Sequence, residues 1–343
     1  MKIFVTGGSG FVGGQTIKHF VARGDDVRAM SRSEKSDATI RALGATPVRC
    51  DLEDVTREHI GDAEAIIHCA AFVEQWGPKD AWKRFNVDGT ARMLKAAREA
   101  GAKRFIHIST ESVLWHGQSL RNVDETYPLA PNSPYPYSWT KAQAEELVRA
   151  ASWTAGASPA DSANAANTSA GAGAGGPRFE TIILRPRFIW GPGDTTLLPT
   201  IEMMAKSGGW MWVNHGRCMT STTHIANLVH AIELSLTKGR GGEAYFVLDD
   251  GVRPMREMIT RMAEARHLTL ANRSVPGWFA DFLGSACEFV WGTFPIKGDP
   301  PITRFSAMIL SRDCILSDAK IRAEMGYRPV ISVDDGMKAL AAG

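Results

Sequence analysis

The sequence predicts an α/β fold: a doubly wound parallel sheet followed by a smaller second domain. Three observations lead there. The 343 residues suggest about two domains at roughly 150 residues each. A strand, a glycine-rich loop and a helix open the chain. Strand and helix patterns then alternate through the first half. We expect a nucleotide-binding domain over residues 1–186 and a mainly substrate-binding domain over 187–343.

The first fourteen residues carry the strongest local signal. Lys2–Thr6 is rich in β-branched and aromatic residues and predicts a buried strand, and Gln15–Arg23 predicts a helix. Gly7, Gly10 and Gly13 lie between them with the spacing G-x-x-G-x-x-G. Such glycines make the turn, admit a pyrophosphate and let the helix pack on the strand, while the helix N-terminus attracts phosphate. We therefore predict a Rossmann dinucleotide site rather than an ordinary turn, with these further contacts: Ser9, Phe11 and Val12.

Composition excludes several classes of protein. Hydrophobic residues make up 44% and charged residues 22% of the chain, and the net charge of +2 comes without a long basic run, so we expect no nucleic-acid partner. The five cysteines are scattered and form no C-x-x-C pair. This argues against a disulfide framework or zinc site and favours a reducing compartment. No apolar leader is recognisable, so we expect a cytoplasmic protein.

The second strand, Asp26–Met30, ends at a residue that bears on cofactor choice. An acidic residue near this point would hold the ribose hydroxyls of NAD. The chain has Ser31, Arg32 and Ser33 instead. A guanidinium flanked by hydroxyls suits a 2′-phosphate. We therefore expect Ser31 and Arg32 to bind NADP, while NAD and a simply exposed arginine remain alternatives.

The third and fourth strands are predicted at Thr46–Arg49 and Ala65–Cys69. Asp51 can reach the adenine edge, and Leu52 is grouped with it as a cofactor contact. The small residues after the fourth strand leave room for a nucleotide: Ala70 and Ala71. A long helix follows over Asp80–Ala100, and its internal Gly89 suggests close packing.

Hydroxyl groups follow the fifth strand, Arg104–Ser109, where they would face the ligand crevice. The next helix begins at Pro136, and its Tyr137 and Lys141 are four residues apart and share a face. A nearby ammonium favours the phenolate and lowers the pKa of a tyrosine, which would allow proton exchange with an alcohol. This spacing also arises by chance, but beside the glycine loop it indicates a catalytic pair.

Together these motifs resemble the short-chain dehydrogenases/reductases of the extended type. Thr6–Gly13 is similar to the family's cofactor motif, and Tyr137-x-x-x-Lys141 to its catalytic pair. The resemblance places the catalytic serine or threonine on Thr110, with Ser109 and Ser112 as other candidates. Tyr137 and Lys141 would also contact the cofactor. The segment Leu184–Gly193 resembles the approach to the substrate domain and adds one contact, Pro186.

The C-terminal part narrows the resemblance. Pro300–Phe305, Asp318–Lys320 and Gly326–Pro329 look like the 3β-hydroxysteroid dehydrogenase-like branch, which includes 2-alkyl-3-oxoalkanoate reductases. This implies an NAD(P)-dependent oxidoreductase that interconverts a ketone and a secondary alcohol on a sterol-like or long-chain 3-oxoacyl substrate. A nucleotide-sugar epimerase/dehydratase is the first alternative. A non-catalytic NADP-sensing protein is the second.

One segment has a different composition. Of the 23 residues Thr154–Gly176, 17 are Ala, Gly or Ser. This is too little apolar bulk for a core, so we expect a flexible surface insertion within the first domain.

The second domain is predicted to contain helices at Leu197–Ser207 and Thr222–Ser235 and no metal site. Residues 276–295 form the most apolar stretch, which suits a membrane surface, a lid over a greasy substrate, or core. Large aromatic side chains favour a lipid-like ligand: Trp190, Trp210, Trp212, Trp278, Phe279, Phe282, Phe289, Trp291 and Phe294. Three arginines keep a diphosphate ligand open: Arg187, Arg217 and Arg253. The oligomeric state, including a homodimer, stays open.

Overall fold

A computed structural model describes residues 1–74, 76–152, 179–294 and 296–342. Its centre is a seven-stranded sheet with the order β12-β7-β5-β4-β1-β2-β3. Every pairing in this sheet is parallel, which confirms the predicted doubly wound class. The strands are β1 (Lys2–Thr6), β2 (Asp26–Ser31), β3 (Thr46–Arg49), β4 (Ala65–His68), β5 (Arg104–Ile108), β7 (Glu180–Pro186) and β12 (Ala244–Val247).

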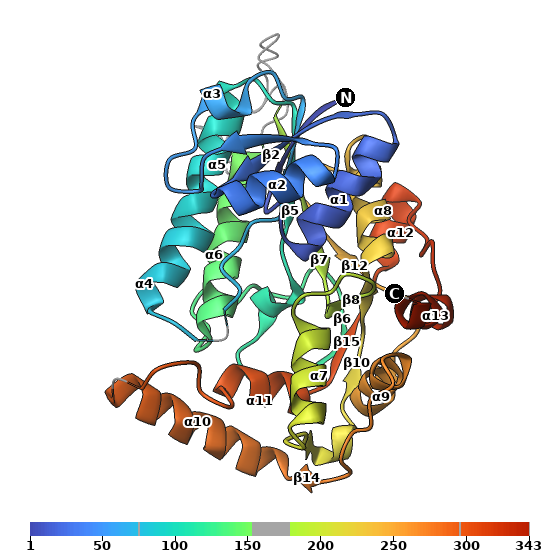
Figure 1. Ribbon diagram of the computed structural model, residues 1–343. Helices are drawn as coiled ribbons and strands as arrows, with labels where there is room; N and C mark the ends of the chain where they lie inside the picture. Colours follow the sequence, from blue (N-terminus) through green and yellow to red (C-terminus); the bar gives the residue numbers. More distant parts are fainter. Residues whose placement is uncertain (75, 153–178, 295, 343) are drawn as a thin grey trace, which may run out of the picture.

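Helices cover both faces of this sheet because alternate strand residues point to opposite sides. Ile3 and Val5 pack with one helix layer, whereas Phe4 between them packs with the other. Figure 1 shows the two layers on either side of the strands. One layer comprises α1 (Phe11–Ala22), α8 (Ile225–Ser235) and α12 (Ala319–Met325); the other comprises α3 (Arg57–Ile60), α5 (Gly89–Glu99) and α6 (Pro136–Ala151). Helix α2 (Glu34–Ala42) links β2 to β3.

The long helix predicted over residues 80–100 is not uniform. It consists of α4 (Lys79–Trp82), a π-helical stretch η1 (Lys83–Asp88) and α5. A Cβ on Gly89 would lie 2.9 Å from the Cβ of Leu52, so the expected close packing is confirmed. The π-helical stretch turns the buried Asn86 toward the backbone of Phe72 and the Thr140 hydroxyl, where it makes three hydrogen bonds.

Most residues after 186, together with segments around 111–123, form a second packed region, which includes a core of tryptophan and methionine side chains. It includes a four-stranded sheet of order β13-β10-β15-β6 and two small strand pairs, β11-β8 and β14-β9. Its strands are β6 (Leu120–Val123), β8 (Ile189–Trp190), β9 (Trp212–Val213), β10 (Met219–Thr220), β11 (Thr223–His224), β13 (Arg253–Pro254), β14 (Ser274–Val275) and β15 (Cys314–Leu316). The helical elements are η2 (Glu111–Leu114), α7 (Leu197–Lys206), η4 (Asn214–Gly216), α9 (Met255–Ala265), α10 (Gly277–Thr293), α11 (Arg304–Ser311) and α13 (Val333–Ala342).

The chain crosses between the two regions several times. α8, β12 and α12 return to the seven-stranded sheet, although they follow residue 186. The helix expected from residue 222 begins only at Ile225, because Thr223–His224 pairs with β8 as strand β11. The predicted domain boundary at 186/187 therefore stays a prediction, because elements on its C-terminal side also pack in the first region.

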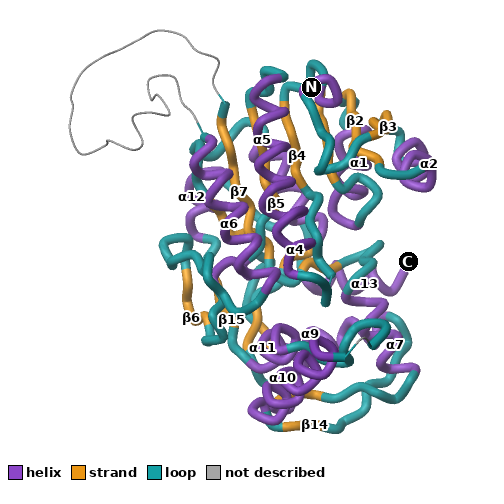
Figure 2. The backbone as a smooth tube through the Cα atoms, turned by 90° about the vertical axis from the view of Figure 1, so that its left-hand side faces the viewer, coloured by secondary structure: helices purple, strands orange, loops and turns teal. Residues whose placement is uncertain are grey.

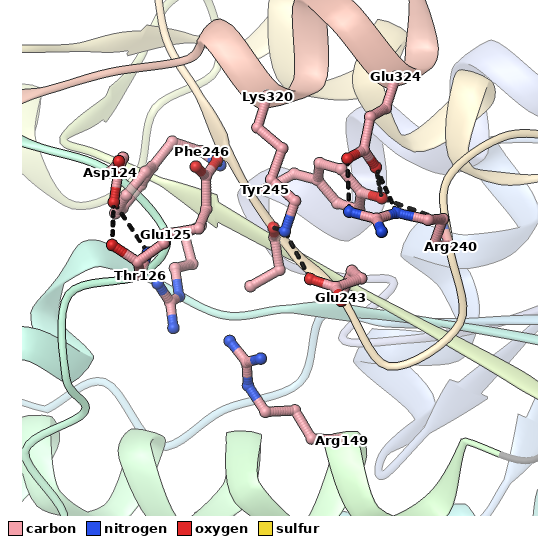
Figure 3. Close-up of polar contacts among 12 residues, drawn as sticks. Asp124, Glu125, Thr126, Arg149, Arg240, Glu243, Tyr245, Phe246, Lys320 and Glu324 are labelled. Carbon is pink, nitrogen blue, oxygen red and sulfur yellow. Dashed lines mark hydrogen bonds and ion pairs between the residues drawn. The ribbon is translucent and has the colours of Figure 1, made fainter.

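Side chains cover the outer edge of β12, where backbone groups would otherwise be free to pair with another strand. The backbone N–H of Phe246 donates to Glu125 Oε1 at 2.7 Å. Lys320 of α12 bonds Glu243 at 2.5 Å, and Glu324 accepts from Tyr245 Oη at 2.6 Å (Figure 3). These contacts fasten α12 and the turn after β6 to the end of the sheet.

α10 and α11 lie together at the end of the molecule remote from β3 (Figures 1 and 2). They approach closely at Gly284, where a Cβ would come within 2.9 Å of the backbone N of Arg304. Among the described residues, no helix is long and apolar enough to cross a membrane. The insertion predicted at Thr154–Gly176 lies outside the described residues.

Candidate active site

A cleft of about 1900 Å³ runs between the carboxyl ends of the parallel strands and the second region. Its lining begins at the glycine loop, passes the start of α6 and ends among α7, α10 and α11. Most of the residues expected to touch a cofactor line it: Gly7, Ser9, Gly10, Phe11, Val12, Gly13, Arg32, Asp51, Leu52, Ala70, Ala71, Tyr137 and Pro186. Two do not line it, Ser31 and Lys141.

The geometry of the glycine loop explains its residues. Gly7 has a φ of +69°, which disfavours other residues, and its carbonyl accepts from Gly10 N at 2.9 Å. A Cβ on Gly13 would lie 2.2 Å from the Gly7 carbonyl oxygen, so α1 could not pack this closely on β1. A Cβ on Gly10 would meet only that same oxygen within 4 Å. The loop therefore exposes backbone to the cleft at the N-terminus of α1, as a pyrophosphate requires.

Polar side chains gather where β2 ends. Arg32 is exposed and lines the cleft with Ser36, whose hydroxyl donates to Ser9 Oγ at 2.7 Å. Ser31 instead is buried, and its hydroxyl donates to the Ser33 carbonyl at 3.2 Å. In the described part of the chain, no hydrogen bond or ion pair engages the Arg32 guanidinium, and it is available to an anion in the cleft.

Three hydroxyl groups follow β5, and their surroundings differ. Ser109 Oγ donates to Glu145 Oε2 at 2.8 Å, and Ser112 Oγ bonds Ser138 Oγ at 2.8 Å. Thr110 lines the cleft next to Tyr137, and Ser112 does not. Ser109 reaches the cleft, but its hydroxyl is held by a buried carboxylate. Of the three, Thr110 is therefore best placed to act with Tyr137.

Thr110 has a charged partner of its own. Its hydroxyl donates to Glu111 Oε2 at 2.8 Å and accepts from Ser112 N at 3.1 Å. Glu111 Oε1 bonds the Arg187 guanidinium at 2.5 Å, and both side chains are buried. A carboxylate only accepts hydrogen bonds, so the single proton of Thr110 points to Glu111.

Lys141 lies one helical turn after Tyr137, below the cleft surface. Its ammonium donates to the Ile108 carbonyl at 2.8 Å and to His107 Nε2 at 3.3 Å. Burial lowers the pKa of Lys141 to about 8, partly opposed by the Glu145 carboxylate. Burial and Lys141 together lower the pKa of His68 to about 3, and His68 is a buried core histidine.

The expectation that Lys141 lowers the pKa of Tyr137 is wrong for this structure. Burial of the phenol and the neighbouring Glu111 carboxylate raise the pKa of Tyr137 above its usual range, and the Thr110 hydroxyl opposes them. The Lys141 ammonium is directed to backbone and to His107 instead. Tyr137 is therefore protonated at neutral pH and can donate a proton.

The remote half of the cleft is predominantly apolar. Of the nine aromatic residues expected there, Trp210, Phe279 and Phe289 line it, whereas Trp190 and Trp212 belong to the core. The arginines that suggested a diphosphate do not line it: Arg187, Arg217 and Arg253. Arg304 does, but it is paired with Glu288 at 2.7 Å. Lys79 is the other basic residue of this half among the described lining residues.

Sequence reasoning missed several residues of the site. Glu111 and Arg187 are 76 positions apart, so no local pattern links them. Ser36 could have been found from the sequence. Ser33 is a typical N-cap residue, and a cap there places Ser36 in the first turn of α2, close to Arg32. Within the described residues, no group of three or more His, Cys, Asp or Glu could hold a metal ion.

The family model of the 3-beta hydroxysteroid dehydrogenase/isomerase family matches residues 4–259. A 4-hydroxy-2-methyl-3-oxo-4-farnesyl-3,4-dihydroquinoline-1-oxide ketoreductase from Stigmatella aurantiaca is 35% identical, covering 99% of this chain and 96% of its own. A 2-alkyl-3-oxoalkanoate reductase from Stenotrophomonas maltophilia is 32% identical, covering 100% and 99%.

The fold is also found in solved structures. A dTDP-glucose 4,6-dehydratase from Streptomyces venezuelae superposes with a TM-score of 0.73 at 21% identity, covering 100% of this chain and 96% of its own. The predicted resemblance to the 3β-hydroxysteroid dehydrogenase-like branch is confirmed by the family match and by the two reductases. The chain belongs to the 3-beta hydroxysteroid dehydrogenase/isomerase family and is an oxidoreductase of the extended short-chain type.

Proposed function

We propose that the protein interconverts a ketone and a secondary alcohol on a hydrophobic substrate, with NADP as cofactor. The observation that carries this proposal is the apolar remote half of the cleft, which begins beside Thr110 and Tyr137. Both relatives named above are reductases, one of a farnesylated quinoline oxide and one of 2-alkyl-3-oxoalkanoates. A long-chain 3-oxoacyl, prenylated or sterol-like ketone is the corresponding substrate class.

Tyr137 is the proposed proton donor. Its raised pKa keeps the phenol protonated near neutral pH, which is the form needed to protonate a developing alkoxide. The nicotinamide, when bound, exchanges a hydride with the substrate carbon. Lys141 supplies positive charge one turn after Tyr137 on α6, and in this mechanism its ammonium would hold the nicotinamide ribose after turning from the Ile108 carbonyl and His107. The protonated phenol is the form of Tyr137 that the reductive step requires.

Thr110 is the proposed second contact to the substrate oxygen. Its proton points to Glu111, so its oxygen offers lone pairs to the cleft and can accept from Tyr137 or from a substrate hydroxyl. To donate to a ketone, Thr110 must turn its proton away from Glu111. The Glu111–Arg187 pair therefore controls which partner the Thr110 hydroxyl serves.

The residues present fit a dinucleotide. The exposed backbone of the glycine loop suits the pyrophosphate, and the small Ala70 and Ala71 leave room beside it. Arg32, Ser9 and Ser36 supply a cation and hydroxyls where a 2′-phosphate would lie. This donor set favours NADP over NAD.

A nucleotide-sugar epimerase or dehydratase is the second candidate function, since a dehydratase shares the fold. A diphosphate would need cations in the remote half, and Arg304 there is already paired. A non-catalytic NADP sensor is the third candidate. A sensor has no need of Tyr137 beside Thr110, so the pairing speaks against it.

Turnover separates the three candidates. Long-chain 3-oxo acids, steroids and UDP-sugars should be screened with NADP(H) and NAD(H). We expect turnover of one of the first two classes with NADP(H). Saturable turnover of a UDP-sugar alone would favour the epimerase, and binding of NADP without turnover would favour the sensor.

Replacing Tyr137 tests the mechanism. Tyr137→Phe should lower kcat by about 10²-fold or more, the usual scale for general acid–base help, while NADP(H) affinity stays nearly unchanged. Tyr135→Phe, which also removes one hydroxyl from the cleft wall, is the matched control and should matter much less. Near-normal turnover by Tyr137→Phe with an accepted substrate would refute the mechanism.

A further inference from the structure

The wall of the cleft beside Tyr137 contains a hydrogen-bond donor without a partner. Trp82 of α4 lines the cleft and is 3% exposed, and its ring lies edge-on to that of Tyr137 with 6.0 Å between the ring centroids. Within the described residues, no hydrogen bond engages the indole N–H of Trp82, yet this N–H is not closed off from solvent. Because a buried indole N–H usually has a partner, this donor is available to a ligand in the cleft.

The neighbours of Trp82 hold its ring in place and leave space beside the N–H. Phe72 packs edge-on against the ring, with 4.8 Å between the two centroids. Gly77 also lines the cleft, and a Cβ there would lie 3.9 Å from Trp82 Nε1. The φ of Gly77 is not positive, so its backbone conformation does not require glycine. A larger side chain at this position would instead occupy the space next to the indole N–H.

A cation without a partner lies one helical turn before this donor. Lys79 and Trp82 are three residues apart on α4, so they share a face of the helix, and both line the cleft. In the described part of the chain, no hydrogen bond or ion pair engages the Lys79 ammonium, whereas Arg304 is held in an ion pair. The lining carboxylates Glu74 and Asp299 also make no described ion pair with Lys79. An ammonium and an N–H one turn apart suit a carboxylate, which only accepts hydrogen bonds.

We propose that Lys79 and Trp82 bind the carboxylate of a 3-oxo acid whose ketone lies at Tyr137. A single carbon separates the carboxylate from the ketone in such an acid, so the protein must offer donors to both groups at neighbouring positions. The contact between the rings of Trp82 and Tyr137 brings two such donors together. This inference rests on the proposed function and narrows its substrate class, because a ketone without an acid group would leave Lys79 and the Trp82 N–H unused.

Calorimetric binding to the full chain with NADP⁺ tests the site without turnover, because NADP⁺ cannot reduce a ketone. Three probes with the same alkyl tail differ only beside the ketone: 3-oxododecanoate, its methyl ester and 2-undecanone. The wild type should bind the acid most tightly. Lys79→Gln removes the charge and should weaken acid binding about three- to tenfold relative to both neutral probes. Trp82→Phe keeps a ring but removes the N–H, and should weaken the acid about tenfold relative to 2-undecanone.

The matched control is Lys83→Gln, which removes an exposed lysine at the end of α4 outside the cleft lining and should bind all three probes as the wild type does. Thermal unfolding of each variant checks that it is folded. A wild type that binds the acid no better than 2-undecanone, or an unchanged preference for the acid in both variants, would overturn the proposal. An equal loss for all three probes in Trp82→Phe would assign Trp82 to packing and reject its part in the site. Failure of the proposed function would appear separately, as binding of the acid without turnover once NADPH replaces NADP⁺.

Discussion

A chain of contacts through Thr110, Glu111 and Arg187 links the buried side of the site to Tyr137 at the cleft. Arg187 fixes the Glu111 carboxylate, Glu111 holds the Thr110 proton, and the same carboxylate raises the pKa of Tyr137. Removing that charge should therefore lower the pKa of Tyr137 and leave Thr110 freer to donate to a carbonyl. A residue buried behind the site thus has a measurable influence on its chemistry.

Glu111→Gln should shift the pH profile toward lower pH. Reduction needs a protonated Tyr137 and is lost as the pH rises through the pKa of Tyr137; oxidation needs the phenolate and gains over the same interval. The pH at which kcat for reduction falls and the pH at which kcat for oxidation rises should both shift to lower values. Glu74→Gln, a carboxylate elsewhere on the cleft wall, is the control.

Folding of Glu111→Gln needs its own check. The substitution leaves the buried Arg187 without its carboxylate partner, and in comparable cases this lowers the free energy of unfolding by about 3–5 kcal/mol. The double variant Glu111→Gln/Arg187→Gln removes both charges and should show the same pH shift. If the pH dependence of kcat is unchanged in both variants, Glu111 does not influence the pKa of Tyr137.

We expect Arg32 to decide between NADP and NAD. A hydrogen bond to a charged group contributes about 1.5–3 kcal/mol, so Arg32→Ala should weaken NADP(H) binding tenfold or more and change NAD(H) binding little. Fluorescence titration with both reduced cofactors measures this. Arg41→Ala, an exposed arginine of α2 outside the cleft lining, is the control. An equal loss for both cofactors, or none, would remove the basis for preferring NADP.

At the level of elements, the contact between α10 and α11 depends on one glycine. A Cβ on Gly284 would lie 2.9 Å from backbone atoms of Thr303 and Arg304, which begin α11 and cannot move aside like a side chain. Thr303 also caps α11, because its hydroxyl accepts from Ser306 N at 3.1 Å. A displaced α10 would therefore disturb the start of its neighbour as well.

Gly284→Ala should lower the free energy of unfolding by about 1–3 kcal/mol, the usual cost of overpacking. Gly292→Ala is the matched control in the same helix, since nothing lies within 4 Å of its Cβ. It should be neutral or stabilising by up to about 1 kcal/mol through helix propensity. Denaturant unfolding and hydrogen exchange in α10 report both effects. Equal behaviour of the two variants would show that the contact is not tight.

For the whole molecule, local features were predictable and distant contacts were not. The glycine loop and the pair Tyr137–Lys141 are set by neighbours in sequence, and the structure has the expected strand, loop and helices there. The burial of Ser31 depends on how α2 packs. The partner of Glu111 is Arg187, 76 positions later in the connection between β7 and β8. The return of β12 to the main sheet reflects tertiary packing that no strand pattern records.

The length of the cleft yields the last prediction. Each buried methylene is worth about 0.8 kcal/mol, which corresponds to roughly fourfold in kcat/KM. Across a homologous series of 3-oxo acids, kcat/KM should rise by up to this factor per methylene while the chain lies along Trp210, Phe279 and Phe289. It should level off once the tail reaches the open end beside α10. A series without slope would show that the substrate chain does not occupy the apolar half, even if a short ketone is reduced.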